Sequence, residues 1–391
     1  MKGTINKHLL PLIGAIAGDI IGSPYELKGC RIKTTDFPLF SQDSTFTDDT
    51  ILTLAVAQWV VKRNSDLISL FHTMGNKYIN VGFGHAFKCW LRSDSPKPYN
   101  SWGNGSAMRV SSIGLACGTL QEVLDLAEQT ASITHNHPEG IKGAQAVAAS
   151  VYLAYWGFSK LNIKDYIEKT FEYNLNRTIE DIRETYSFDS SCQGSVPEAI
   201  IAFLESTNFE DAIRLAVSLG GDADTQASIA GAIAGAFYKK MSQSIISEIV
   251  EKLPNELLDI LYSFNDFIPP QKIMLAVTAK EDTILKCHIQ YSFALAYNGV
   301  QDVFIPKATR LELSSVLISD ENKYDGYATF HLINNRKTIF SILENEIQLK
   351  YPEYIKEDTC LVERILLYSK TSELEQFEIS PLTMEDVLAQ I

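Results

Sequence analysis

The chain has 391 residues, which is more than one hydrophobic core usually supports, so we expect two domains. With 46% hydrophobic and 21% charged residues it has the composition of an ordinary globular protein. Its net charge of −14 argues against nucleic-acid binding as its main function, and its six scattered cysteines, with no CxxC pair or Cys/His metal spacing, fit reduced thiols in a cytoplasmic protein.

The first predicted element is the apolar run 9–18, which imitates a signal peptide. Asp19 interrupts the run, and it is too short to span a membrane, so no membrane partner is expected. Gly14, Gly18 and Gly22 fall on one helical stripe, which predicts a buried helix that another helix can approach closely. A matching stripe of small residues recurs later in the chain, at Ala227, Gly231 and Gly235. We expect these two helices to pack together and to frame one site.

Helical spacing of apolar residues dominates the chain as far as residue 265. It occurs at 51–63, 122–133, 140–158, 161–172, 197–205, 209–219, 226–240 and 243–264. Because none of this part alternates as a strand would, residues 1–268 are predicted to form an all-α domain. Two long loops, 26–46 and 93–106, interrupt the pattern, and loops of this length in a compact domain usually carry function.

The pattern changes after the Pro-containing segment 265–270, which we interpret as a domain boundary. Short strands are predicted at 273–277, 303–305 and 327–333, with an amphipathic helix at 283–299 and another near 337–350. Residues 269–391 are therefore expected to form a small α/β or α+β domain. No catalytic constellation is evident in it, so an accessory role is expected.

Two acidic segments within the helical domain share one plan, although they are far apart in the sequence. Segments 46–50 (FTDDT) and 220–225 (GGDADT) each supply two Asp and at least one Thr directly before an apolar helical run. Clustered hard oxygen donors suit Mg²⁺ or Mn²⁺ better than zinc, which prefers His and Cys. The alternative is that Thr47 and Asp222 only cap helices, with acidic residues in the first turn. The occurrence of both segments in one domain favours the metal interpretation.

Five motifs in a fixed order now identify a family. They are 18–26 (GDIIGSPYE), 47–50 (TDDT), 103–109 (GNGSAMR), 134–138 (THNHP) and 221–225 (GDADT). Together they closely resemble the ADP-ribosylglycohydrolase family over roughly residues 10–265. The resemblance implies an all-α fold, two Mg²⁺ ions (Mn²⁺ being an alternative) and hydrolysis of a glycosidic bond at C1″ of ADP-ribose.

The resemblance also implies roles for individual residues. Metal ligands would be Thr47, Asp48, Asp49, Asp222, Asp224 and Thr225. Glu26 is the candidate acid or base beside the leaving group, and it forms the predicted catalytic set with Asp48 and Asp224. ADP-ribose would contact Gly103, Asn104, Gly105, Ser106, Met108 and His135, where a glycine-rich loop suits a phosphate cradle. For Asp19 a structural role is expected, either capping a neighbouring helix or supporting a ligand.

Electrostatics supports a metal site independently of the resemblance. Four converging carboxylates carry about −4, and two like charges about 4 Å apart repel by roughly 4 kcal/mol at an effective dielectric of 20. Two divalent cations would balance this charge. Without them, at least one carboxylate is expected to have a raised pKa.

The expected function is therefore metal-dependent release of ADP-ribose from a modified acceptor, on an ADP-ribosylated protein or a small ADP-ribose conjugate. Arginine is the favoured acceptor, and serine, other side chains, nucleic-acid ends and small molecules stay open. One alternative is an ADP-ribose-binding or toxin-neutralising immunity protein with little or no hydrolysis. Another is a metal phosphohydrolase, which would need its metals near the diphosphate. Retention of all six ligand positions favours the hydrolase.

Overall fold

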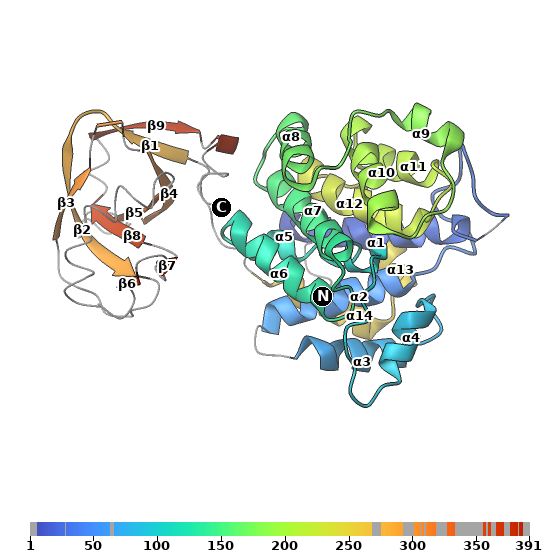
Figure 1. Cartoon of the computed structure of the whole chain (residues 1–391). Coiled ribbons are helices and arrows are strands. Elements are labelled where there is room, and N and C mark those ends of the chain that lie inside the picture. The colour runs from blue at the N-terminus through green and yellow to red at the C-terminus, as the bar shows by residue number, and fades with distance from the viewer. Residues whose placement is uncertain are drawn as a thin grey trace. The chain divides into compact units, whose positions relative to one another are not determined.

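The computed structural model describes residues 6–27, 29–62, 66–267, 275–291, 301–305, 307–308, 310–317, 327–332, 355–356, 359–360, 365–370, 376–381 and 383–385. The chain divides into two compact units, Met1–Pro270 and Gln271–Ile391. Figure 1 shows that the described elements of the first unit are helices and those of the second are mainly strands. No helix among the described residues is both long and apolar enough to span a membrane.

The first unit is all-α, as predicted. Its helices are α1 (Leu10–Gly22), α2 (Asp48–Lys62), α3 (Leu67–Lys77), α4 (His85–Leu91), α5 (Ile113–Ala116), α6 (Leu120–Ser132), α7 (Pro138–Tyr155), α8 (Lys160–Phe171), α9 (Ile179–Thr185), α10 (Cys192–Glu205), α11 (Phe209–Val217), α12 (Ala223–Tyr238), α13 (Gln243–Lys252) and α14 (Asn255–Asn265), with short 3-10 turns η1 (Lys7–Leu9), η2 (Ser23–Tyr25) and η3 (Asn104–Ser106). Between residues 6 and 267 the described part of the chain forms no strand, only an isolated bridge between Gly103 and Ser191.

Most of the predicted helices are present, and the single helix predicted at 243–264 is wrong. Pro254 separates α13 from α14: Leu253 before it is extended, and Pro254 itself precedes the first residue of α14. Proline lacks an N–H and disfavours helical geometry in the preceding residue, and because Leu253 is extended here, α13 ends before Pro254. The apolar pattern alone did not indicate α3, α4, α5 and α9. Of these, α4 and α9 have only seven residues each and α5 has four.

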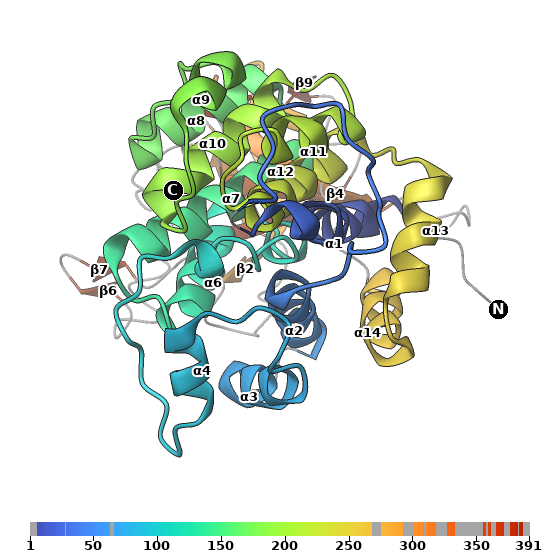
Figure 2. The ribbon, with the colours of Figure 1, turned by 90° about the vertical axis from the view of Figure 1, so that its right-hand side faces the viewer.

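Helices α1 and α12 pack antiparallel at the centre of the unit, and the two lie side by side in Figure 2. A Cβ added at Gly18 would overlap the carbonyl group of Ala227, and one at Gly14 would overlap that of Gly231. Glycine is needed at these positions because the two backbones touch directly. The predicted close approach of the two small-residue stripes is thus confirmed. It brings the end of α1 beside the start of α12, where the second acidic segment lies.

The predicted long loop between α1 and α2 is held by basic side chains that donate to its carbonyl groups. Arg214 of α11 donates from Nη1 to the carbonyl oxygens of Thr35 and Phe37 at 2.9 and 2.7 Å. Lys252 at the end of α13 donates to the carbonyl oxygen of Ser44 at 2.9 Å. Side chains from distant helices thus satisfy backbone groups that would otherwise pair within a helix or sheet.

The described strands of the second unit are β1 (Leu275–Ala279), β2 (Thr283–Tyr291), β3 (Gln301–Ile305), β4 (Arg310–Leu317), β5 (Tyr327–Leu332), β6 (Ile355–Lys356), β7 (Thr359–Cys360), β8 (Ile365–Lys370) and β9 (Phe377–Pro381). Seven of them form an antiparallel sheet in the order β3-β2-β8-β5-β4-β1-β9. The strands predicted at 273–277, 303–305 and 327–333 correspond to β1, β3 and β5.

The helix predicted at 283–299 is wrong over its first nine residues, which form β2. This strand pairs with the next strand, β3, on one side and with the distant β8 on the other, so its conformation depends on pairing and not on its own residues alone. The helix predicted near 337–350 lies outside the described residues.

Candidate metal centre

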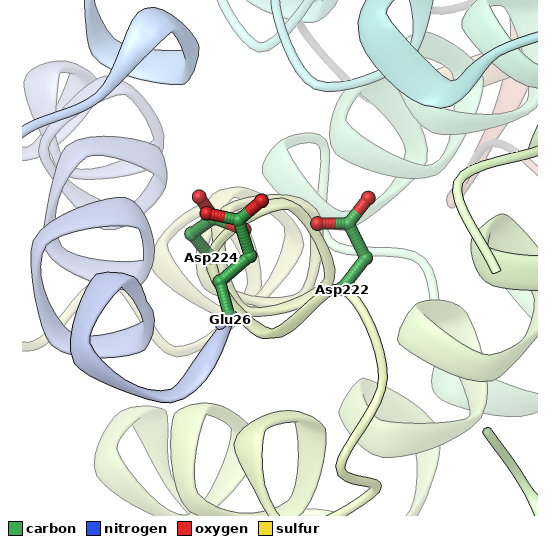
Figure 3. Close-up of side chains that lie close together, drawn as sticks. All are labelled: Glu26, Asp222 and Asp224. Atoms are coloured by element: carbon green, nitrogen blue, oxygen red, sulfur yellow. The ribbon is translucent and has the colours of Figure 1, made fainter. Parts of the chain in front are cut away.

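Three carboxyl groups meet where the end of α1 faces the start of α12. Glu26, Asp222 and Asp224 each place an oxygen within 4.8 Å of the others, and Figure 3 shows the three groups gathered at the start of α12. Both aspartates are buried, whereas Glu26 is partly exposed. Glu26, predicted as an acid or base, thus also lies within metal-ligand distance of two predicted ligands. Among the described residues, Asp48 and Asp49 do not belong to this group of three carboxylates.

The first acidic segment lies beside this group. Thr225 donates a hydrogen bond from Oγ1 to Oδ2 of Asp49 at 3.2 Å, which joins the start of α12 to the start of α2. The other oxygen of Asp49, Oδ1, is buried and has no hydrogen-bond partner among the described residues. A buried carboxylate oxygen without a donor is costly, and a bound cation would satisfy it.

Asp19 of α1 holds the start of α2 in place. Its carboxylate accepts hydrogen bonds from the backbone N–H of Thr47 at 2.9 Å and of Thr50 at 3.0 Å, and from the hydroxyl groups of both threonines. Two of these donors are amide groups at a helix N-terminus, which have no partner within their own helix. Asp19 therefore caps a neighbouring helix, as expected, and positions the backbone that carries Asp48 and Asp49.

The alternative interpretation is that Thr47 and Asp222 only cap helices. The structure shows a capping hydrogen bond for Thr47 but not for Asp222. The Thr47 hydroxyl accepts a hydrogen bond from the backbone N–H of Asp49 at 3.3 Å, as an N-cap residue does. Asp222 makes no such bond to α12. Its Oδ2 instead accepts a hydrogen bond from Nδ2 of Asn104 at 2.8 Å, so the Asp222 carboxylate faces the Gly103–Arg109 loop.

Burial, and after it the charges of the neighbouring carboxylates, raises the pKa values of the gathered acidic groups. Burial, with the charges of Asp19, Glu26 and Asp222, raises the pKa of Asp48 to about 8. Burial, followed by neighbouring aspartates, raises the pKa values of Asp49 and Asp224 well above their usual range. Burial and the charge of Asp222 raise the pKa of Glu26 as well. This is the behaviour expected of a site that a cation would neutralise.

The Gly103–Arg109 loop adjoins the acidic group through several predicted ADP-ribose contacts. Besides its bond to Asp222, the Asn104 amide donates to Oγ of Ser195 at 3.2 Å. The hydroxyl of Ser106 is fully buried and donates to the carbonyl oxygen of Gly140 at 2.7 Å, so it anchors the loop to α7. Sδ of Met108 lies 3.9 Å from Oγ1 of Thr225.

His135 is buried against the same loop. A Cβ at Gly105 would lie 3.2 Å from its Nε2, and one at Gly103 would lie 3.6 Å away. Its Nδ1 lies 2.7 Å from Oγ1 of Thr134, and burial together with the charge of Arg109 keeps its pKa well below the usual range. Gly103, Gly105 and His135 are thus brought together as the predicted binding loop requires.

Arg31 belongs to this site, and sequence reasoning missed it. Its Nε donates to the carbonyl oxygen of Glu26 at 2.9 Å, and its guanidinium lies 4.3 Å from the centre of the Phe188 ring. Its charge lowers the pKa values of Glu26 and Asp222, although burial outweighs this effect. No local motif indicates it, because Phe188 lies far away in the sequence.

The chain is similar in sequence and in fold to known proteins. A sequence model of the ADP-ribosylglycohydrolase family matches residues 6–268. The chain is 27% identical over 312 residues to the ADP-ribosylhydrolase ARH3 of Xenopus tropicalis, covering 61% of this chain and 89% of that protein. It is 25% identical over 284 residues to the ADP-ribosylarginine hydrolase Tri1 of Pseudomonas putida (strain GB-1), covering 63% and 76%.

A solved structure of an ADP-ribosylglycohydrolase-related protein complex shares the fold. It aligns with a TM-score of 0.51 at 22% identity and covers 66% of this chain and 96% of that chain. The match of the family model spans most of the chain, and it coincides with the helical unit that holds both acidic segments. The protein therefore belongs to the ADP-ribosylglycohydrolase family.

Proposed function

We propose that this protein is a metal-dependent hydrolase that cleaves the glycosidic bond between C1″ of ADP-ribose and a modified acceptor. One observation carries the proposal: two buried acidic helix starts, joined by the Thr225–Asp49 hydrogen bond, lie against a glycine-rich loop and Glu26. Family membership and the names of the relatives support ADP-ribose hydrolysis in general.

The residues proposed to hold two Mg²⁺ ions, or Mn²⁺, are Thr47, Asp48, Asp49, Asp222, Asp224 and Thr225. All offer hard oxygen atoms, and the unpartnered Oδ1 of Asp49 and the raised pKa values fit a site that binds cations. Such ions would supply charge stabilisation and would make a bound water more acidic. Asp19 and Asn104 would keep these ligands oriented through their hydrogen bonds.

Glu26 is proposed to move the proton in the reaction. Glycoside cleavage needs protonation of the leaving group or deprotonation of the attacking water. Glu26 is partly exposed beside Asp222 and Asp224, and its raised pKa suits a group that alternates between acid and base. Arg31 holds the Glu26 backbone through its carbonyl group.

Arginine is proposed as the acceptor, as the resemblance suggests and as the name of the relative Tri1 indicates for that protein. The partner would be an ADP-ribosylated protein or a small ADP-ribose conjugate in the cytoplasm. Residues 269–391 would be accessory, because all the proposed ligands lie before them.

The test is incubation with substrates mono-ADP-ribosylated on arginine or on serine, in Mg²⁺ and in EDTA, followed by detection of free ADP-ribose. We expect Mg²⁺-dependent release, fastest from arginine. Tight ADP-ribose binding without release from any linkage would instead identify a binding protein, and release that EDTA leaves unchanged would contradict the metal mechanism.

A further inference from the structure

The turn 78–84, which joins α3 to α4, lies against the start of α2, and none of the five motifs includes it. Figure 2 shows α3 beside α2. Within the turn, the carbonyl oxygen of Val81 accepts a hydrogen bond from the backbone N–H of Asp48 at 3.1 Å. The next residue, Gly82, has a φ of +119°, a conformation that residues with a side chain rarely adopt. The turn therefore brings a glycine to a proposed metal ligand.

Gly82 lies against the carboxylate of Asp48. A Cβ added at Gly82 would lie 2.8 Å from Oδ1 of Asp48 and 3.7 Å from the Cβ of Thr47. Carbon and oxygen atoms that are not bonded to each other usually stay about 3.3 Å or more apart. A side chain at this position would therefore overlap the Asp48 carboxylate where it now lies, and only glycine leaves room for it.

The backbone at the start of α2 cannot withdraw from such a side chain without losing hydrogen bonds. The backbone N–H groups of Thr47 and Thr50 donate to Asp19, and that of Asp48 donates to Val81. These bonds hold the start of the helix from two sides and satisfy amide groups that have no partner within it. Relief from crowding would therefore come from rotation of the Asp48 side chain, because its carboxylate is the outer end of a short, rotatable group.

The turn itself is fixed by aromatic packing on both sides of Gly82. The ring of Tyr78 meets that of Phe46 edge to face, with 5.9 Å between the ring centroids. Phe83 is buried, and its ring stacks on that of Phe87 with 5.0 Å between the centroids. Because close-packed rings resist displacement, a side chain at position 82 would not simply push the turn away.

We propose that Gly82 is a positioning residue: by lacking a side chain, it lets the Asp48 carboxylate keep the orientation in which it binds a divalent cation. The inference rests on the proposed function in one respect, namely that Asp48 is a metal ligand. Mg²⁺ demands a nearly ideal octahedral arrangement of its oxygen ligands, so a carboxylate turned aside by a methyl group binds it less well. The effect should thus appear in Mg²⁺ affinity more than in stability.

The experiment compares two alanine variants that share the same backbone strain. Gly157, after α7, has a φ of +89°, and a Cβ there would meet nothing within 4 Å, so Gly157→Ala adds strain without a contact. In EDTA, Gly82→Ala and Gly157→Ala should lower the melting temperature by similar amounts, about 4 °C each. Calorimetric titration of the metal-free proteins with Mg²⁺ should then separate them. Gly82→Ala should bind at least about 10-fold more weakly than the wild type, and Gly157→Ala should bind as the wild type does.

A second comparison tests whether Gly82 acts through Asp48. In protein that carries Asp48→Ala, the added Gly82→Ala change should not weaken the remaining Mg²⁺ binding further, because the carboxylate that the methyl group would displace is gone. Wild-type Mg²⁺ affinity in Gly82→Ala overturns the inference, and so does a further loss in the Asp48→Ala background.

A crystal structure of the wild type with Mg²⁺ gives a test that does not depend on the folding of any variant. Asp48 should bind the ion while its carboxylate stays against Gly82. A turn 78–84 displaced from Asp48 in the metal-bound protein overturns the inference.

The two proposals fail separately. An enzyme that releases ADP-ribose in Mg²⁺, but whose Gly82→Ala variant binds Mg²⁺ as the wild type does, contradicts the positioning role alone. A protein with the expected split between Gly82→Ala and Gly157→Ala, but without hydrolysis of any substrate, contradicts the proposed hydrolase alone.

Discussion

The starts of α2 and α12 carry similar acidic segments, TDDT and GDADT, and the structure holds them by different means. At α2, a buried carboxylate from another helix, Asp19, accepts hydrogen bonds from both Thr47 and Thr50. At α12, the backbone packs directly on the glycine stripe of α1, and Gly22 faces Ala223. Both devices originate from α1. One positions acidic residues by hydrogen bonding and the other by close packing. Substitutions that break each of them should therefore differ in their effects on stability and on Mg²⁺ binding.

The largest expected effect is a loss of activity, and it should be the same for a substitution in either acidic segment. Asp48→Asn and Asp224→Asn each remove one ligand charge, so each should reduce ADP-ribose release at least about 100-fold and weaken Mg²⁺ binding. Helical circular dichroism should not change. Near-wild-type turnover by either variant would mean that the two segments do not form one dinuclear site.

Breaking the packing should cost stability as well as activity. Gly18→Ala places a methyl group against the Ala227 backbone, which cannot move without separating α1 from α12, so we expect a loss of about 3 kcal/mol or more. Urea unfolding measures it. Gly84→Ala is the control for added volume, because a Cβ there meets nothing within 4 Å. Since Gly84 is the N-cap of α4, where Gly is preferred to Ala, the substitution should still cost about 1 kcal/mol.

Breaking the hydrogen-bonded support should cost somewhat less. Asp19→Ala leaves amide and hydroxyl donors of Thr47 and Thr50 unpaired in a buried site, and we expect a loss of about 2 to 3 kcal/mol and weaker Mg²⁺ binding. Asp66→Ala is the control, because Asp66 caps α3 at an exposed position through bonds to Ile68 and Ser69. It should cost about 1 kcal/mol and leave Mg²⁺ affinity unchanged. Equal effects on Mg²⁺ binding would argue against a special role for Asp19.

A further expected effect is on pH dependence. Because the pKa of Asp48 rises to about 8 in the folded protein, from 3.8 ordinarily, the folded state binds more protons than the unfolded state between these values. The metal-free protein should therefore lose stability as pH rises through this window. Bound Mg²⁺ keeps the carboxylates ionised, so the trend should disappear in its presence. Melting temperatures in EDTA and in Mg²⁺ across the window measure this, and identical profiles would exclude metal binding at Asp48.

Local patterns in the sequence determined much of this protein. Helical periodicity predicts most of the described helices of the first unit, since one face of each helix must be apolar. The two small-residue stripes predict the contact of α1 with α12, because only very small side chains allow backbones to touch. The two acidic segments predict a shared site, and the Thr225–Asp49 hydrogen bond joins them.

Only the tertiary structure decided the partnerships between residues that are distant in the sequence. No local pattern in the sequence shows that Arg31 lies over Phe188 or that the Ser106 hydroxyl donates to the carbonyl oxygen of Gly140. Nor does it show that the Thr134 hydroxyl lies between Arg109 and His135. The conformation of β2 likewise depends on β3 and β8, and a nine-residue run with mixed polarity does not settle it. Periodicity in the sequence indicates which face of a helix or strand is buried. The hydrogen-bond partners of buried polar groups depend on the folded structure, because only there does each buried donor need an acceptor.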